Sequence, residues 1–230
     1  MAPTRDRCNT ILTKLKSLGS SRAVEGMARF GINVPKIWGV SAPDLHSLAR
    51  EIGRDHGLAA RLWKTGVHDA RILAALIDDP AKVTPRQMER WARDFDSWAV
   101  CDAACSCLFD KTPYAWTKAV EWTGREPEYV KRAGFVLMAA LAIHDKKALD
   151  ERFEAFVPLI IKHATDERNF VKKAVNWALR QIGKRNIRLN LLAIRAAQDI
   201  RRIDSKAAGW IASDALRELT CDKVRARLAR

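Results

Sequence analysis

The sequence lacks the apolar segments that export and membrane insertion require. No stretch reaches the roughly 18 apolar residues that span a bilayer. The N-terminal segment MAPTRDRCNTILTKLKSLGS never holds the run of about 7–15 apolar residues that a signal peptide needs. The longest apolar run, GFVLMAALAI (residues 134–143), has the length of a buried core helix. We therefore expect a cytoplasmic protein.

The glycine motifs with which backbone amides bind phosphate are also missing. The eleven glycines never form G-x-G, which excludes a dinucleotide fingerprint, and there is no P-loop. A G-x-S-x-G nucleophile elbow is absent, as are the alternating patterns and Asn-Gly turns of β-hairpins. Any chemistry must therefore come from side chains on helices.

Cysteine pairs with the spacing of a zinc site are not present either. The stretch DSWAVCDAACSCLFD holds Cys101, Cys105 and Cys107, but structural zinc sites favour C-x2-4-C pairs repeated at a distance. There is no second pair and no nearby His-x3-His. We expect all five cysteines to be reduced thiols and these three to be small packing residues. The sequence predicts no metal site and no cofactor.

The feature that is present in excess is positive charge. The 230 residues include 41 Lys and Arg against 27 Asp and Glu, for a net charge of +14. An excess of this size in a folded domain indicates a polyanionic partner, nucleic acid first and an anionic membrane surface second. The alternative is a basic protein with a solvated surface.

Helical periodicity runs through almost the whole chain. The expected helix starts are Ser41, Thr84 followed by Pro85, Thr112 followed by Pro113, Asp166, Asp204 and Thr220. The helix that follows Asp166 should stop at Gly183. About a dozen helices joined by short polar turns is typical of stacked helix pairs. Because no Pro/Gly/Ser-rich linker divides the chain, we predict one all-α domain over residues 1–230.

Trp98 and Asp102 are a first candidate site. At i and i+4 they lie on one face of a helix, a single turn apart. An exposed indole beside a carboxylate could receive a cationic group. The alternative is that Trp98 packs in the core while Asp102 caps a helix or pairs with a lysine, and spacing alone favours this alternative.

A second candidate is the segment NFVKKAVNWALRQIGKRN (residues 169–186). Lys173, Trp177 and Arg180 fall at i, i+4 and i+7 and form one stripe, and cations around an aromatic ring suit a sugar-phosphate backbone. A surface helix whose tryptophan turns inward explains the pattern equally well. Arg132, beside Lys131 at the start of the long apolar run, could anchor a phosphate or simply solvate a helix end.

The remaining aromatic and histidine residues are expected to have structural roles. We predict that the other six tryptophans belong to the core: Trp38, Trp63, Trp91, Trp116, Trp122 and Trp210. Two His-Asp dipeptides, at residues 68–69 and 144–145, could form acid–base pairs, but such pairs more often start or finish helices.

Several of these segments, taken in order, resemble a known family. The sequence is similar to bacterial DNA alkylation repair glycosylases of the AlkD type in five segments. In chain order these are FGINVPKIWGVSAPDLHSLAREI, SWAVCD, YVKRAGF, NFVKKAVNWALRQIGKRN and WIASDALREL. The resemblance runs from Phe30 to Leu219. It implies a right-handed superhelix of antiparallel HEAT-like helix pairs, with a concave basic groove that holds duplex DNA. It also implies a monofunctional enzyme that removes purines alkylated at N3 or N7 with the base still stacked.

The resemblance assigns roles to particular residues. The family's catalytic aspartate matches Asp102, its flanking tryptophans match Trp98 and Trp177, and its arginine near the lesion's backbone matches Arg132. The basic residues that we predict as DNA contacts are Lys131, Lys172, Lys173 and Arg180. One departure is the single tryptophan before Asp102, where some relatives carry two.

The predicted partner is double-stranded DNA that contains alkylated purines, bound by a monomer without membrane association. Two alternatives remain open. The first is a non-catalytic HEAT-like module that binds duplex or branched DNA, and the second is a helical scaffold for another protein. The scaffold predicts weak DNA affinity with little salt dependence, whereas several phosphate contacts predict a steep one.

Overall fold

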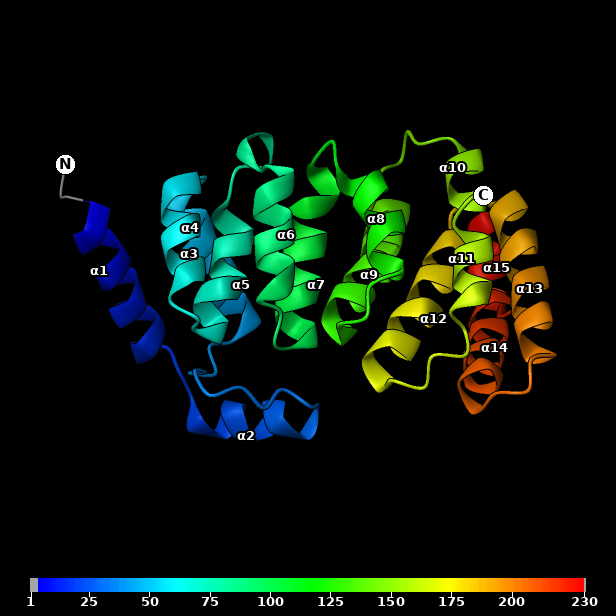
Figure 1. The fold of residues 1–230 in the computed structure, drawn as a ribbon, viewed down its shortest axis with the longest axis horizontal. Coiled ribbons are helices and arrows are strands. Elements are labelled where there is room, and N and C mark those ends of the chain that lie inside the picture. Colours follow the sequence, from blue (N-terminus) through cyan, green and yellow to red (C-terminus); the bar gives the residue numbers. More distant parts are fainter. Residues whose placement is uncertain (1–3, 230) are drawn as a thin grey trace. The chain divides into compact units, whose positions relative to one another are not determined.

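The computed structural model describes residues 4–229, and over that range the chain forms α-helices and short 3-10 helices without any strand (Figure 1). The predicted all-α class is therefore confirmed. The chain divides into two units, Met1–Thr112 and Pro113–Arg230, and each is described by itself. The single domain over residues 1–230 stays a prediction.

Unit 1 is built around α5, which packs against α3, α4 and α7. Its core includes a parallel stack of Trp63 and Trp91, with ring centroids 3.8 Å apart. The helix α2 differs from its neighbours, because none of its side chains is buried. The elements of unit 1 are α1 (Thr4–Ser17), α2 (Ser21–Arg29), α3 (Ala42–Ile52), α4 (His56–Lys64), α5 (His68–Ile77), η1 (Pro80–Lys82), α6 (Pro85–Arg93), α7 (Trp98–Cys107) and η2 (Phe109–Lys111).

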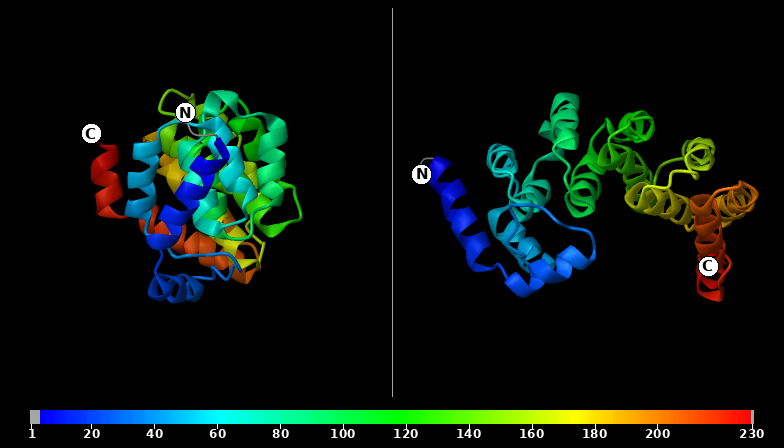
Figure 2. Two further views of the ribbon diagram at one scale, coloured as in Figure 1. Left: turned by 90° about the vertical axis from the view of Figure 1, so that its left-hand side faces the viewer. Right: turned by 60° about the horizontal axis from the view of Figure 1, so that its bottom comes forward.

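Unit 2 is a run of helices in which packing also joins helices that are not consecutive in the chain (Figure 2). The helix α9 contacts α8 and α12, while α12 contacts α14, and α13 packs against both α12 and α14. The elements of unit 2 are α8 (Ala115–Thr123), α9 (Glu128–His144), α10 (Asp150–Glu154), α11 (Val157–Lys162), α12 (Asn169–Gly183), α13 (Ile187–Arg201), α14 (Lys206–Leu219) and α15 (Asp222–Leu228).

A glycine sets the close approach of α8 and α9. A Cβ on Gly134 would lie 2.7 Å from the backbone nitrogen of Thr123 and 3.0 Å from the carbonyl oxygen of Ala119. No real Cβ tolerates the shorter distance, so only glycine lets α9 pack this tightly on α8. The apolar run that begins here is buried from Gly134 to Ala142, which confirms the predicted core helix.

Some of the predicted helix ends are confirmed. The hydroxyl of Ser41 accepts a hydrogen bond from the backbone N–H of Asp44, and Thr84 does the same for Gln87, with Pro85 as the first helical residue. The helix α12 ends at Gly183, as expected.

Other predicted caps are wrong, because the helices begin at other residues. The N-cap residues of α8 and α15 are Tyr114 and Cys221, and the hydroxyls of Thr112 and Thr220 donate to the carbonyls of Phe109 and Leu216 instead. Ser205, not Asp204, accepts from the first turn of α14. Asp166 lies three residues before α12, and its carboxylate accepts from the backbone of Arg168.

The predicted core position is confirmed for three of the six tryptophans. Trp63, Trp91 and Trp122 are buried, and Trp38 and Trp116 are half-buried. The core prediction for Trp210 is wrong, because 40% of this residue is exposed on α14. Among the described residues, no helix has both the length and the apolar character that a membrane crossing needs.

Candidate functional site

In unit 1, the candidate site lies on the helix α7. Ser97 caps this helix by accepting from the backbone N–H of Val100 at 3.3 Å. The cap places Trp98 at the first helical position and Asp102 one turn later, and both side chains are half-buried. The indole Nε1 of Trp98 donates to the carbonyl oxygen of Phe30 at 3.0 Å. The tryptophan is thus tied to the segment after α2 while part of its surface stays accessible.

Two of the three cysteines of α7 lie on its buried side, whereas Cys107 is half-buried. Cys101 and Cys105 are fully buried, together with Val100 and Ala104, which agrees with their prediction as packing residues. Burial raises the pKa of the Cys105 thiol well above its usual value, and the neighbouring Cys101 and Asp102 raise it further. The thiol is therefore neutral, which suits neither a metal ligand nor a nucleophile. In the part of the chain that the structure describes, no three His, Cys, Asp or Glu side chains cluster as a metal site.

In unit 2, the candidate residues of α9 bind other parts of the protein. Arg132 is buried, and its Nη1 donates to the carbonyl oxygen of Phe170 at 2.6 Å, which ties α9 to the first turn of α12. Lys131 forms an ion pair with Asp166 at 2.8 Å.

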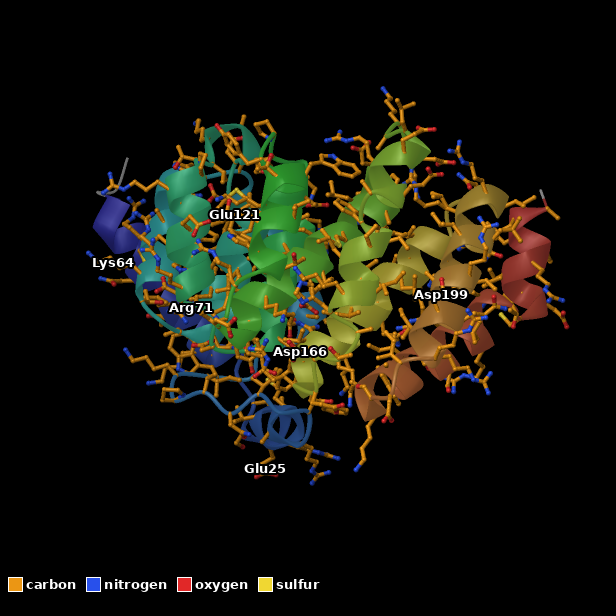
Figure 3. All side chains as sticks on the ribbon, turned by 45° about the vertical axis from the view of Figure 1, so that its right-hand side comes forward. Glu25, Lys64, Arg71, Glu121, Asp166 and Asp199 are labelled. Carbon is orange, nitrogen blue, oxygen red and sulfur yellow. The ribbon has the colours of Figure 1, made fainter. Side chains whose placement is uncertain are left out.

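Asp166, which is labelled in Figure 3, also forms an ion pair with Arg168. Burial alone would raise the pKa of the Asp166 carboxyl, but hydrogen bonds from Arg168 and Lys131 hold it well below its usual value. Lys131 therefore shares its carboxylate partner with Arg168.

The predicted stripe on α12 is divided between solvent and protein partners. Lys173 is exposed. Trp177 is half-buried, and its Nε1 donates to the Gln181 side-chain oxygen at 2.9 Å when that amide is oriented with its oxygen toward the ring. Arg180 turns to α14 and forms ion pairs with Glu218 and, at 3.6 Å, with Asp214.

The carboxylate of Glu218 binds two cations, one on α12 and one directly after the end of that helix. It accepts hydrogen bonds from Arg180 and from Lys184. Burial would raise the pKa of Glu218, but these hydrogen bonds lower it below its usual value. Arg180 is thus engaged in holding α14 against α12, a role that its position in the sequence did not reveal.

An aromatic contact that sequence reasoning missed lies on the same pair of helices. The ammonium of Lys172 lies 5.3 Å from the ring centroid of Trp210 on α14, within the range of a cation–π interaction. No sequence signal joins these positions, because they lie on different helices.

The structure therefore brings Trp98 and Asp102 together on α7 in unit 1. In unit 2 it joins α9 to α12 through Arg132, and α12 to α14 through Lys172 and Arg180. Among the predicted DNA contacts, Lys173 is exposed, whereas Lys131 and Arg180 have carboxylate partners.

Helix pairs stacked in sequence order, with aromatic and basic side chains on them, are typical of the α-helical repeat proteins. Comparison with known proteins is more specific. The model of the family described as DNA alkylation repair enzyme matches residues 11–219, so the chain belongs to this family. This confirms the resemblance found in the sequence.

A solved structure shows a similar fold. It is described as "A new family of proteins related to the HEAT-like repeat DNA glycosylases with affinity for branched DNA structures". The two chains share 20% sequence identity and a TM-score of 0.78, over 96% of this chain and 95% of the other. The predicted HEAT-like fold is confirmed by this likeness. No curated protein matches the sequence.

Proposed function

We propose that the protein is a monofunctional DNA glycosylase that hydrolyses the N-glycosidic bond of purines alkylated at N3 or N7 in duplex DNA. The observation that carries the proposal is the half-buried Trp98–Asp102 pair on one face of α7, in a chain that belongs to the DNA alkylation repair enzyme family. The net charge of +14 supports a nucleic-acid partner.

The chemistry explains why a carboxylate and an indole suffice. Alkylation at N3 or N7 makes the purine cationic, so the base departs with the electron pair of the C1′–N bond and becomes neutral. Positive charge then develops on the deoxyribose. A carboxylate at Asp102 stabilises this charge and positions the water that attacks C1′, taking up the proton that the water loses. The Trp98 ring adds cation–π stabilisation of about 0.5–2 kcal/mol.

The residues of unit 2 are assigned to the same reaction by the family resemblance. Trp177 would contact the sugar and Arg132 the lesion's phosphate backbone. The guanidinium of Arg132 donates to the carbonyl oxygen of Phe170, so it would contact the phosphate from the junction of α9 and α12. Lys173 is the best placed of the predicted phosphate contacts because it is exposed.

The test is release of free base from methylated duplex DNA. We expect the wild-type chain to release 3-methyladenine or 7-methylguanine, and the Asp102→Asn variant to lose at least about a hundredfold in rate, because removal of one electrostatic group from a site typically does so. Duplex affinity should change by less than about twofold, because Asp102 makes no attractive contact with phosphates.

A matched control is Asp96→Asn, which removes an exposed carboxylate in the same unit that pairs with Arg71. This variant should excise as the wild type does. Undiminished excision by Asp102→Asn would remove Asp102 from the mechanism.

A second candidate is a non-catalytic module that binds branched DNA. It is favoured by the similar solved structure, whose description names affinity for branched DNA. Binding of a four-way junction in preference to a duplex of equal length, with no base released from methylated DNA, would support this candidate against the glycosylase.

A further inference from the structure

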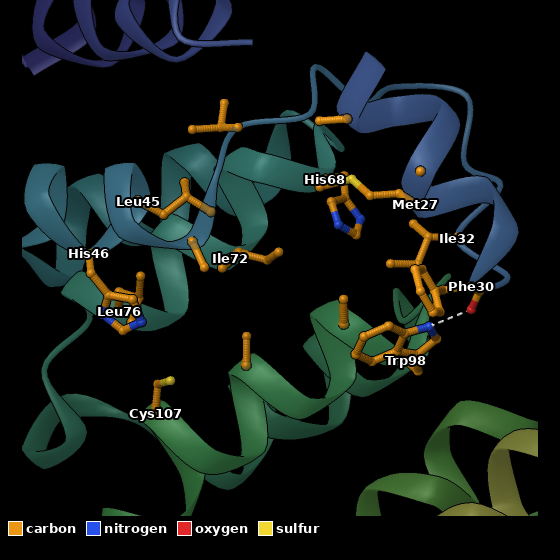
Figure 4. A pocket seen from close by; sticks show the side chains of 16 residues that line it. Met27, Phe30, Ile32, Leu45, His46, His68, Ile72, Leu76, Trp98 and Cys107 are labelled. Carbon is orange, nitrogen blue, oxygen red and sulfur yellow. Dashed lines mark hydrogen bonds between the residues drawn. The ribbon is translucent and has the colours of Figure 1, made fainter. Parts of the chain in front are cut away.

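Two hollows of unit 1 share no residue. The first, a cavity of about 580 Å³, lies among α2, α3, α5 and α7, and its apolar lining includes Trp98 and His68 (Figure 4). The second, of about 500 Å³, is lined by residues of α4 and α6 and by Asp94, which directly follows α6. Lys and Arg side chains lie on the second hollow, whereas none is among the described residues that line the first. Positive charge is therefore gathered between α4 and α6, apart from the candidate pair on α7.

The helices α4 and α6 are strongly basic. The helix α4 has no acidic residue, and Glu89, which is half-buried, is the only acidic residue of α6. We call the basic residues of the two helices the α4–α6 surface, and they are Arg61, Lys64, Arg86, Arg90 and Arg93. All of them are exposed except Arg61, which is half-buried.

Two buried tryptophans fix how closely α4 and α6 lie. Trp63 on α4 and Trp91 on α6 form the parallel stack of the core, and they are only 3% and 1% exposed. The indole Nε1 of Trp63 donates to the carboxylate of Asp94 at 2.8 Å, so this acid is held by the stack. The packing of the two rings therefore brings basic residues of both helices to one hollow.

Among the described residues, no carboxylate forms an ion pair with a cation of the α4–α6 surface. Acids of unit 1 that form ion pairs do so with other cations, as Asp79 does with Lys82 and Asp96 with Arg71. In unit 2, by contrast, Arg180 has two carboxylate partners. Like charges that are gathered without partners repel one another, and a bound polyanion would relieve that repulsion.

The arginines of α6 match the spacing of phosphates along a DNA strand. Arg86, Arg90 and Arg93 fall at i, i+4 and i+7, so they follow one face of the helix. At a rise of about 1.5 Å per residue they span about 10 Å of helix axis. One strand of a duplex carries a phosphate about every 3.4 Å along the axis, so this span covers about three phosphates. A small phosphate ester has its charge at one point and would leave most of the surface unpaired.

We propose that the α4–α6 surface is a second DNA contact, which binds the phosphate backbone of a duplex segment other than the one at Trp98 and Asp102. The inference rests on the proposed function only in taking DNA as the partner, and it does not require that a base be excised. Because the contacts are with phosphates, binding here is independent of base sequence. One chain can therefore hold two duplex segments.

The number of duplexes bound by one chain tests the proposal. With a short unmethylated duplex in excess at low salt, analytical ultracentrifugation of the full chain should show two duplexes per chain. The triple variant Arg86→Gln/Arg90→Gln/Arg93→Gln should bind one, because it loses three phosphate contacts. For the wild type, log affinity for the second duplex should fall against log salt with a slope of about −2.7 or steeper, the value for three contacts at about −0.9 each.

The matched control removes three arginines that already have carboxylate partners. Arg188, Arg202 and Arg217 are exposed and form ion pairs within unit 2. The variant Arg188→Gln/Arg202→Gln/Arg217→Gln lowers the net charge by the same amount as the α6 variant. It should still bind two duplexes, because its arginines are not part of the α4–α6 surface.

Three results would each overturn the proposal: one duplex per wild-type chain, two duplexes per chain of the α6 variant, or equal loss of the second duplex in the control. If the α6 variant does not fold, Arg61→Gln/Lys64→Gln on α4 decides, because it should also weaken the second duplex.

Base excision separates this proposal from the glycosylase. The α6 variant should release methylated base at the wild-type rate. Two bound duplexes without any excision would remove the glycosylase and leave the second DNA contact in place. Excision by a wild-type chain that binds a single duplex would do the reverse.

Discussion

Neighbouring residues on α7 have different roles, because some of them are buried in the core and others keep accessible surface. Cys101 and Cys105 point into the core, while Trp98 and Asp102 keep accessible surface on another face. The burial that raises the pKa of Cys105 removes the thiolate that a cysteine needs for reactivity. The residue type that first draws attention in this stretch is therefore inert, and the carboxylate next to it carries the proposed chemistry.

Trp98 can be tested apart from Asp102. The variant Trp98→Phe keeps an aromatic face but loses the hydrogen bond to the Phe30 carbonyl. We expect excision to slow by roughly threefold to tenfold, the effect of one neutral hydrogen bond on the position of the ring. Single-turnover release of methylated base measures this effect. An unchanged rate would mean that the indole N–H does not position the ring.

From the lowered pKa of Asp166 we predict how the stability of the protein depends on pH. Its folded pKa lies below the unfolded value because Arg168 and Lys131 hydrogen-bond its ionised form. Its contribution is therefore fully present above the unfolded pKa of about 3.9 and is lost as pH falls toward the folded pKa. The free energy of unfolding should drop less between about pH 6 and pH 3 in Asp166→Asn than in the wild type. Urea denaturation measures this difference, with the exposed Asp204→Asn as control.

At the scale of helices, replacing glycine with alanine should change the free energy of unfolding in opposite directions at two helical positions, Gly26 and Gly134. Gly26 has open space where a Cβ would lie, whereas Gly134 has the Thr123 backbone 2.7 Å away. Gly26→Ala should raise the free energy of unfolding by about 0.5–1 kcal/mol through helix propensity. Gly134→Ala should lower it by roughly 1–3 kcal/mol, because α9 must move away from α8. Thermal or urea denaturation measures both, and the same sign for both would contradict this packing.

Helix positions could be predicted from the sequence better than helix contacts. Ser41 and Thr84 cap as expected because a hydroxyl before a periodic segment has the N-terminal amides as its nearest partners. Thr112 and Thr220 fail because the helices that follow begin later than expected, with Tyr114 and Cys221 at the N-cap positions. The pairing of Arg180 with Glu218 could not be predicted, because it depends on how α12 packs on α14.

The candidate site was predictable to a similar degree. Periodicity placed Trp98 and Asp102 on one face of a helix, and family resemblance gave that pair a role. The exposure of Trp210 and the cavity around His68 could not be predicted, because both depend on which helix faces remain uncovered in the folded chain.

For the whole molecule, the net charge of +14 does not measure the number of cations available to DNA. Lys173 is exposed on α12, whereas Arg180 on the same helix is paired with Glu218 and Asp214. A cation that already holds a carboxylate must break that pair before it can neutralise a phosphate. The exposed lysine should therefore contribute more to DNA affinity than the paired arginine.

The salt dependence of duplex binding tests this difference. Each phosphate contact contributes a slope of about −0.9 to the plot of log affinity against log salt. Lys173→Gln should make the slope less steep by about that amount, while Arg180→Gln should change it by less than half as much. Fluorescence anisotropy over a range of salt concentrations gives both slopes. A larger change for Arg180→Gln would show that DNA displaces its carboxylate partners.

The hydrogen bond between Trp98 and Phe30 provides a probe of local opening by hydrogen exchange. Its acceptor is a backbone carbonyl in the segment between α2 and α3, and its donor is an indole proton with a resolved NMR signal. While the bond holds, that proton exchanges slowly with solvent, and each opening of the segment exposes it. The protection of this one proton from exchange therefore reports the free energy of opening of the hydrogen bond that joins α7 to the segment after α2.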